Sequence, residues 1–166
     1  MANYRIGEAT RREEDLRILR GRGRYVDDFK MHNMVRGHVL RSPYAHAEIK
    51  SIDVSQAQAA PGVLLVLTGR DYLERGLGTL LPMQASKMAD GSDGFVTPQP
   101  LLATDRVRFV GEAVAFVVAE THAQAQDAAE LIVVDYERLP SVIRTEDAVS
   151  PNSISIWEKN SNNEKK

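Results

Sequence analysis

The pattern of hydrophobic and polar residues is clearest over residues 106–140, where it predicts a strand, a helix and a second strand. Residues 113–119 are apolar without a break, which is typical of a strand buried on both faces. Thr121 then stands where a helix N-cap is expected, with Gln124 as its capping-box partner. A stripe of mostly small apolar residues follows at helical spacing and allows the helix to lie close to a sheet. Its members are Ala125, Ala128, Ala129 and Ile132.

The second strand of this unit begins where the spacing of the apolar residues changes to two. Ile132, Val134 and Tyr136 share one face of the predicted strand, and the residues between and after them occupy the other. Pro140 ends the run. The continuous apolar run, the helical spacing and the spacing of two, together with the Thr121 cap, all predict the same strand–helix–strand unit. This unit is interpreted as core scaffold without a catalytic constellation.

Further strands and short helices are expected on both sides of this unit. The predicted strands are Met34–Arg41, interrupted by Gly37, Ala45–Val54, Val63–Leu67 and the start of one at Ile154–Trp157. The predicted helical turns start at Glu13, cover Gln56–Ala60 with Ser55 as the cap, and cover Tyr72–Glu74 and Thr145–Val149, while Tyr25–Phe29 is expected to be a short extended piece that runs into a turn. Together these elements predict an α+β fold, that is, a mixed α/β domain with a mixed sheet and a few short helices, whose strand order the pattern does not give.

Two stretches have no regular pattern. Gly76–Pro100 is a long segment rich in glycine and proline, and such a loop inside a compact domain is usually functional or disordered. The last seven residues, 160–166, are polar and are expected to be disordered.

Composition narrows the possible functions. The chain has 166 residues, which suits one domain, and its net charge of −2 gives no reason to expect attraction to nucleic acid or to a membrane surface. It contains no cysteine, so it cannot supply disulfides, thiolate nucleophiles or iron–sulfur ligands. The N-terminal residues lack the apolar core of a signal peptide, and no apolar stretch reaches the ~20 residues that span a bilayer. The expected location is the cytoplasm.

Two motifs near the N-terminus could carry chemistry. Gly21-Arg22-Gly23-Arg24 could bind a phosphate through its backbone N–H groups, but a glycine turn after a short helix is favoured because no strand precedes it and no P-loop lysine is present. Asp27-Asp28 could hold a metal or act as an acid–base pair, but a turn with side chain–backbone bonds is favoured because adjacent extended residues face opposite sides.

The histidines and one glutamate are weaker candidates. His46 is expected on the polar face of its strand, exposed to solvent or hydrogen-bonded. The other histidines, His32, His38 and His122, lack the spacing of metal ligands. Glu112 after Gly111 could act as a general base at the mouth of the sheet, although a glycine bend beside a solvated carboxylate is favoured. On these grounds no catalytic, cofactor-binding or metal-binding residue is assigned.

Several of these stretches together, in the same order, resemble the start of the large subunit of molybdenum hydroxylases. That family comprises the xanthine dehydrogenases, aldehyde oxidases and aerobic carbon monoxide dehydrogenases. Arg20 departs from the pattern, because the family more often has threonine there. The matching stretches are Ile6-Gly7, Arg17–Asp28, Arg41–Ala47, Ile52-Asp53, Pro61–Val63, Thr68–Asp71, Leu102-Ala103, Val107–Glu112, Val114-Ala115, Asp127–Glu130, Asp135–Glu137 and Leu139-Pro140.

The resemblance implies the N-terminal α/β hammerhead domain of that subunit. The implied domain covers residues 1–150, and residues 151–166 would be a truncated start of the following domain and a disordered tail. In the family the large subunit binds molybdopterin, and electrons pass to 2Fe-2S clusters and FAD on other domains or subunits. The catalytic residues lie in later domains, so none can be transferred to this chain.

The resemblance further implies a structural domain or split subunit without an active site of its own. Its implied partners are the remaining molybdopterin-binding large-subunit domains, with iron–sulfur and FAD subunits as further candidates. A stand-alone protein-binding or ligand-binding module that reuses the hammerhead fold is the alternative. A domain that packs on larger partners is expected to expose apolar surface, with the Gly76–Pro100 loop and the Gly21–Asp28 segment as candidates for that face.

Overall fold

The computed structural model describes residues 7, 12–81, 87, 89–92, 94 and 98–157. The chain divides into two compact units, Met1–Met34 and Val35–Lys166, and each is described by itself. The predicted tail of residues 160–166 and parts of the Gly76–Pro100 loop lie outside the described residues.

The larger unit contains two three-stranded antiparallel sheets. The first has the order β1–β5–β3, from β1 (Arg36–Arg41), β5 (Ala113–Ala119) and β3 (Val63–Thr68). The second has the order β4–β2–β6, from β4 (Arg106–Val107), β2 (Ala47–Asp53) and β6 (Val133–Arg138). The α+β fold is therefore confirmed, whereas the expected mixed sheet is instead two sheets whose described pairings are all antiparallel.

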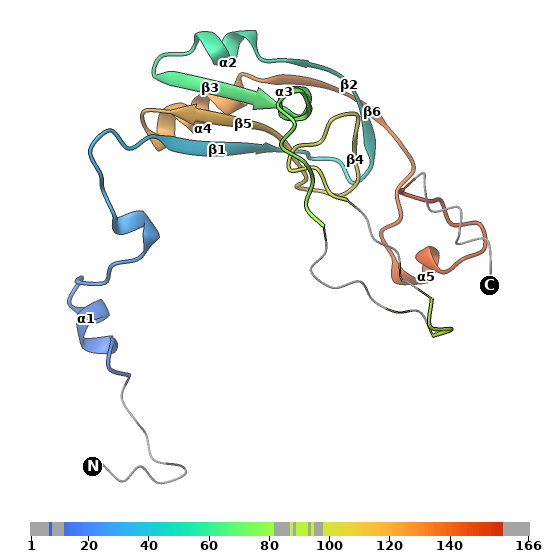
Figure 1. Ribbon diagram of the computed structural model, residues 1–166, viewed down its shortest axis with the longest axis horizontal. Coiled ribbons are helices and arrows are strands. Elements are labelled where there is room, and N and C mark those ends of the chain that lie inside the picture. The colour runs from blue at the N-terminus through green and yellow to red at the C-terminus, as the bar shows by residue number, and fades with distance from the viewer. Residues whose placement is uncertain are drawn as a thin grey trace. The chain divides into compact units, whose positions relative to one another are not determined.

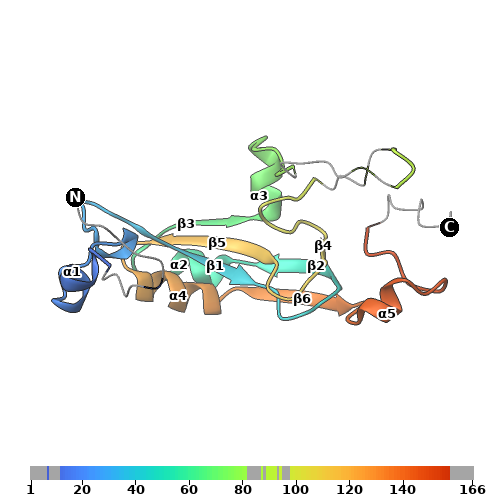
Figure 2. The same cartoon turned by 90° about the horizontal axis from the view of Figure 1, so that it is seen from below.

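The main core lies between the first sheet and two helices. Figures 1 and 2 show α4 (His122–Glu130) and α2 (Ser55–Ala59) on the same side of this sheet. The predicted strand–helix–strand unit is confirmed as β5, α4 and β6. The buried members of this core are Ala57, Val66, Ala115, Val117, Ala119, Ala125, Ala128, Ala129 and Ile132.

The cap of α4 differs in one detail from the prediction. The Thr121 hydroxyl accepts the Gln124 N–H at 3.2 Å, so Thr121 is the N-cap. The Gln124 side chain, however, accepts a bond from the Thr121 hydroxyl at 2.8 Å and does not complete a capping box. The two faces of β5 also differ, because Phe116 and Val118 on the face opposite the helices are only half-buried.

A second core joins the second sheet to the first. It is built around Ala47, Val107 and Val114, which are fully buried, together with Ala103. Ile52 and Val134 pack against both cores and so connect them.

The strand predicted at Ala45–Val54 is confirmed as β2, with a register shift between Ile49 and Ser51 in its pairing with β6. Ser51 is exposed, whereas Ile52 is half-buried and packs against the cores.

Several short elements begin or end differently from the prediction. Gly37 does not interrupt β1, because it pairs with Val118 and leaves room for the ring of Phe116. Ser55 is the first residue of α2 and not its cap, and its N–H donates to the Asp53 carboxylate at 2.9 Å. The third helix, α3 (Gly69–Glu74), starts earlier than expected. Its early start has a local cause: Thr68 and Asp71 form a reciprocal capping box.

Two strands of this unit differ between the structure and the sequence analysis. β4 was not predicted because it has only two residues. The predicted strand at Ile154–Trp157 is wrong, because these residues are irregular, whereas the helical turn before them is confirmed as α5 (Thr145–Ala148).

The long segment after α3 is closed at its base. Leu80 and Gln99 form an isolated antiparallel bridge, with N–H to carbonyl distances of 2.8 and 2.9 Å. The described chain on either side of the segment is therefore held together at this pair.

The N-terminal unit has local structure but no buried residue between positions 12 and 34. It contains α1 (Asp15–Leu19) and a 3₁₀ turn at Val26–Asp28. The turn predicted within Tyr25–Phe29 is therefore confirmed, and the extended backbone is limited to Tyr25 and Phe29 on either side of it. Gly21, at φ +67°, follows α1 in the left-handed region that glycine adopts readily.

Replacing Ala128 by leucine is expected to lower the free energy of unfolding by about 1–3 kcal/mol, because α4 and β5 leave no space for a larger side chain. Chemical denaturation measures the effect. Gln126→Leu is the matched control, since Gln126 is exposed on the same helix. Equal stability of the Ala128→Leu protein and the wild type would contradict the close packing described here.

In limited proteolysis of the isolated chain, trypsin is expected to cut after Arg17, Arg20, Arg22 or Arg24 before it cuts after Arg36 or Arg106. The first four lie on exposed backbone outside any core, and the last two lie in strands. Mass spectrometry of a time course gives the order of cleavage. Earlier cleavage at Arg36 or Arg106 would mean that the sheets open more readily than the N-terminal segment.

Candidate functional site

The loop that precedes β5 contains the most enclosed carboxyl group among the described residues. Glu112 is 6% exposed, and Ser42 beside it is 2% exposed. The Ser42 N–H donates to the Glu112 carbonyl at 2.8 Å, and the Gly111 N–H donates to the Ser42 carbonyl at 2.8 Å. The Arg41 guanidinium adds a bond to the Gly111 carbonyl at 2.8 Å. These bonds hold residues 108–112 against the end of β1.

The position of the Glu112 side chain follows from the backbone of this loop. Gly111 has φ +87°, so the predicted glycine bend is confirmed. The bend brings the Glu112 carboxylate to the Arg108 N–H, which donates to it. The prediction that Glu112 stays solvated is therefore wrong, because the turn folds its carboxylate into the loop.

The surroundings of Glu112 change its acidity. Burial raises the pKa of the Glu112 carboxyl above its usual value, and the negative charge of Asp105 acts in the same direction. The Arg108 N–H and guanidinium oppose this rise in pKa. A carboxyl group with a raised pKa is common in catalytic sites. Here the contacts in the described residues tie the carboxyl to its own loop, which favours a structural role.

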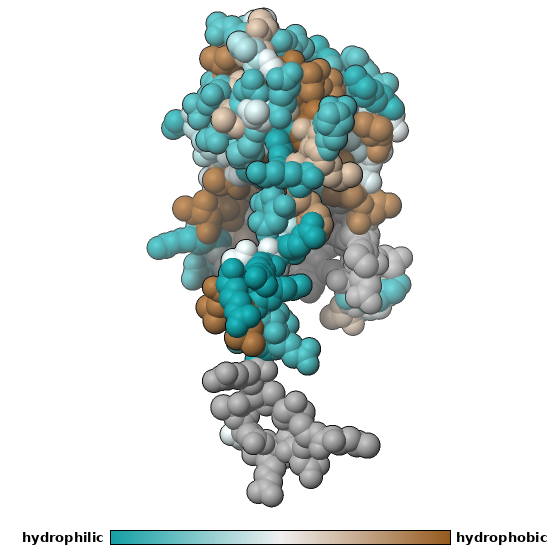
Figure 3. All heavy atoms as spheres, turned by 90° about the vertical axis from the view of Figure 1, so that its left-hand side faces the viewer, coloured by the Kyte–Doolittle hydropathy of each residue, from teal (hydrophilic) through white to brown (hydrophobic). Residues whose placement is uncertain are grey.

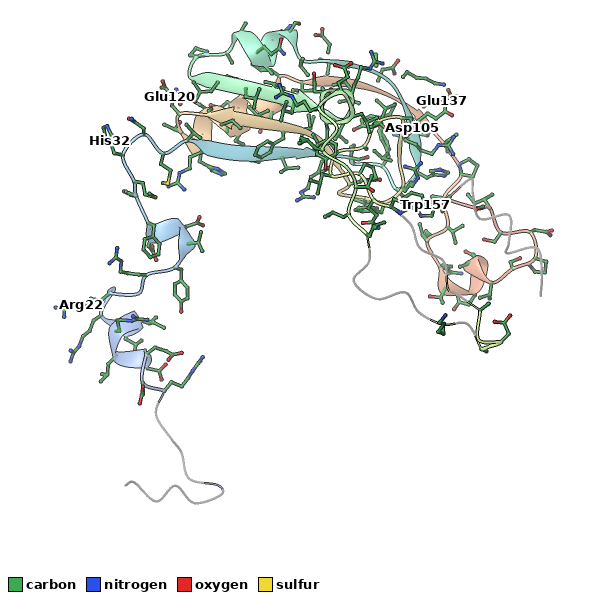
Figure 4. The ribbon with its side chains drawn as sticks, viewed as in Figure 1. Arg22, His32, Asp105, Glu120, Glu137 and Trp157 are labelled. Carbon is green, nitrogen blue, oxygen red and sulfur yellow. The ribbon has the colours of Figure 1, made fainter. Side chains whose placement is uncertain are left out.

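Arg108 makes a second contact that the sequence pattern did not indicate. Its guanidinium lies 4.3 Å from the ring centroid of Trp157 and donates to the Arg106 carbonyl at 3.1 Å. Trp157, labelled in Figure 4, thereby anchors the irregular end of the described chain to the loop. The single tryptophan in the sequence was the available signal, but its partner lies 49 positions away in the chain.

A shallow cleft of about 360 Å³ lies between β2 and the start of α3. Its polar lining consists of the Ser51, Thr68 and Thr104 side chains with Lys50 and Arg70. The Lys50 ammonium lies 2.5 Å from the Glu137 carboxylate and 2.7 Å from that of Glu48.

Hydrogen bonds to Glu137 and Glu48 raise the pKa of Lys50, so its charge already has partners. Glu48 in turn pairs with Arg106 at 3.2 Å. Glu137 is labelled in Figure 4. These groups link β4, β2 and β6 across the exposed face of the second sheet.

Three of the histidines make contacts that can now be named. His46 is only 6% exposed, and its Nδ1–H donates to the Pro140 carbonyl at 2.6 Å, so the hydrogen-bonded alternative is confirmed and the solvent-exposed one is wrong. His38 and His122 meet edge to face with ring centroids 5.8 Å apart, a contact that their spacing did not predict. In the part of the chain that the structure describes, no three His, Asp or Glu side chains form a metal-binding group.

The two N-terminal motifs have structural explanations. The Gly21 N–H donates to the Ile18 carbonyl and the Arg22 N–H donates to the Arg17 carbonyl, both at 2.9 Å. This is the Schellman arrangement that ends a helix, and it occupies the first two N–H groups of the motif, which are then not offered to a phosphate. The Asp28 carboxylate accepts the Tyr25 N–H at 2.8 Å, as expected for a turn. The favoured structural interpretations of both motifs are therefore confirmed.

No helix in the described ranges is long and apolar enough to cross a lipid bilayer.

Comparison with known proteins gives consistent matches to one group of enzymes. The family profile described as aldehyde oxidase and xanthine dehydrogenase, a/b hammerhead domain, matches residues 20–140. The carbon monoxide dehydrogenase large chain of Afipia carboxidovorans is 41% identical over 148 residues, which are 89% of this chain and 17% of that protein. The nicotine 6-hydroxylase large subunit of Paenarthrobacter nicotinovorans is 38% identical over 157 residues, 95% of this chain and 18% of that subunit.

The solved structures agree with the sequence matches. Quinoline 2-oxidoreductase from Pseudomonas putida 86 superimposes with a TM-score of 0.73 and 48% identity, covering 86% of this chain and 17% of the other. This chain therefore spans 17–18% of the length of these relatives.

Glu112→Gln is expected to remove a pH-dependent loss of stability. A carboxyl whose pKa is raised by folding binds its proton more tightly in the folded state, so its contribution is most favourable at low pH. That contribution is lost as the pH rises from about 4.5, the usual value, through the raised pKa. The wild type should therefore lose stability relative to Glu112→Gln over this window, as measured by denaturation at a series of pH values.

Glu120→Gln is the control for this experiment, because Glu120 is exposed and follows the other end of β5. A stability difference between wild type and Glu112→Gln that does not change with pH would contradict the raised pKa.

Proposed function

Because this chain belongs to the aldehyde oxidase and xanthine dehydrogenase family of α/β hammerhead domains, we propose that it is a structural domain or split subunit of a molybdenum-containing hydroxylase or dehydrogenase. The supporting observation is the unequal coverage of the matches. At 41% identity the similarity takes in 89% of this chain but only 17% of the carbon monoxide dehydrogenase large chain. The proposed active site lies in the polypeptide that corresponds to the remainder.

The residues of this chain do not fit the iron–sulfur clusters that such an assembly uses. Cluster iron is held by cysteine thiolates, and the sequence has no cysteine. Within the described ranges, no His, Asp and Glu group offers a metal site either. The 2Fe-2S clusters are therefore assigned, in this proposal, to other domains or subunits. Molybdopterin and FAD are assigned there as well, because this chain covers only 17% of the carbon monoxide dehydrogenase large chain.

The role proposed for this chain is mechanical support. Two antiparallel sheets share the core residues Ile52 and Val134, and a framework packed in this way is suited to holding a larger catalytic domain in place. Its partners are the molybdopterin-binding part of the large subunit and, through the assembly, the electron-transfer subunits.

The isolated chain is expected to contain no molybdenum and to show no oxidation of carbon monoxide, aldehydes or xanthine. The complex captured from the source cells by a tag on the full chain is expected to contain molybdenum and to oxidise one of these classes of substrate. Elemental analysis and dye-linked assays on both samples give the comparison. The untagged strain is the control for background capture.

Stoichiometric molybdenum in the isolated chain would overturn the proposed support role. Recovery of only unrelated partners would instead favour a stand-alone binding module.

A further inference from the structure

Residues 12–34 present large hydrophobic side chains to solvent on a segment without any core of its own. Val26 is 86% exposed, Leu19 83% and Met31 75%. Linkers between domains are usually polar, because exposing an apolar side chain to water is unfavourable in free energy. The exposed apolar side chains of this segment are instead typical of a surface that is buried by binding another protein.

The backbone of the segment is nevertheless well defined locally. The Schellman bonds after α1 and the bond from the Tyr25 N–H to Asp28 set two successive turns. The Arg24 guanidinium lies 4.9 Å from the Phe29 ring centroid. A pre-formed segment loses less conformational entropy when it binds than a disordered one does. The pre-formed part is therefore the two turns, whereas α1, with only five residues, is shorter than the about 12–15 that an isolated helix needs and would gain stability by packing on a partner.

The charges of the segment indicate the chemistry of that partner. Residues 12–34 contain six basic and five acidic residues, but the two kinds are separated. The acidic residues lie at positions 13–15 and 27–28, and the stretch between them contains four arginines, Arg17, Arg20, Arg22 and Arg24, and no acidic residue. Within the described part of this segment, the ion pair present is Arg12 with Glu14. Figure 3 shows hydrophobic surface next to strongly hydrophilic surface in the part of the segment that faces the viewer, and Figure 4 labels Arg22 within it. Arginine binds carboxylates in a planar, two-pronged geometry, so an acidic border around an apolar groove matches this pattern.

We propose that residues 12–34 form a docking arm that lies in an apolar groove bordered by carboxylates on the molybdopterin-binding polypeptide of the assembly. The inference rests on the proposed function and specifies which part of this chain makes the contact. The similarity to the relatives reaches 95% of the chain and so extends into the arm. Carboxylates on a partner explain the arginines better than a bound phosphate does, because the N–H groups of Gly21 and Arg22 are already bonded to carbonyls.

Site-specific photo-crosslinking in the tagged full chain tests the arm directly. A photoreactive amino acid in place of Val26 is expected to crosslink to a molybdenum-containing polypeptide, at a peptide rich in aspartate or glutamate. The matched position is Leu73, which is 57% exposed but lies on α3 in the other unit. A crosslink yield at Val26 well above that at Leu73 supports the arm.

Each other outcome of the crosslinking is decisive. If the molybdenum-containing complex forms but Val26 crosslinks only to residues 35–157 of its own chain or to a second copy, the docking arm is wrong and the proposed function stands. If Val26 crosslinks no more than Leu73 does, the arm is likewise wrong. If no molybdenum-containing complex is recovered at all, both proposals fail.

Charge reversal tests the acidic border. Arg20→Glu with Arg22→Glu is expected to weaken association with the partner at least tenfold and to reduce its dependence on salt concentration, whereas Arg20→Lys with Arg22→Lys retains most of the affinity. Surface-plasmon titrations of the purified partner at two salt concentrations measure both effects. Circular dichroism checks that the sheets remain folded. Equal affinity of the glutamate and lysine variants would overturn the proposal.

Discussion

The close contact of α4 with the first sheet is the constraint on which the rest of the larger unit depends. Alanines face each other across this interface, so helix and strand backbones approach closely and leave little space for larger side chains. The helix then sets where β6 begins, and β6 enters the second sheet. Because Val134 on β6 and Ile52 on β2 pack against both cores, the second sheet is positioned by the first.

The sequence was sufficient for this central unit because its signals are local. The apolar run of β5, the Thr121 cap and the alanine stripe of α4 are each set by residues within a few positions of one another. Prediction failed where the cause lies elsewhere in the chain. The register shift in β2 arises from pairing with β6, and the two residues of β4 become a strand only beside Ala47 and Glu48. The order β1–β5–β3 likewise reflects contacts between distant segments that no periodicity reports.

The same distinction applies to the candidate site. The turn assigned to Gly21–Arg24 could be recognised from its glycines, because a helix C-cap needs a left-handed residue at one position. The burial of Glu112 could not, because it depends on how Gly111 turns the chain and on the bonds from Ser42 and Arg41. His46 is similar: its partner, the Pro140 carbonyl, is supplied by the chain just beyond β6.

The bridge between Leu80 and Gln99 has a consequence for the evolution of the chain. The two ends of the long segment leave the body at one point, so the number of residues between them has little influence on the sheets. The entropy lost on closing a loop grows only slowly with its length, about 0.6 kcal/mol for each doubling. A longer or shorter insert at this point would therefore leave the framework of the two sheets intact, so the segment can change its outer contacts independently of the core.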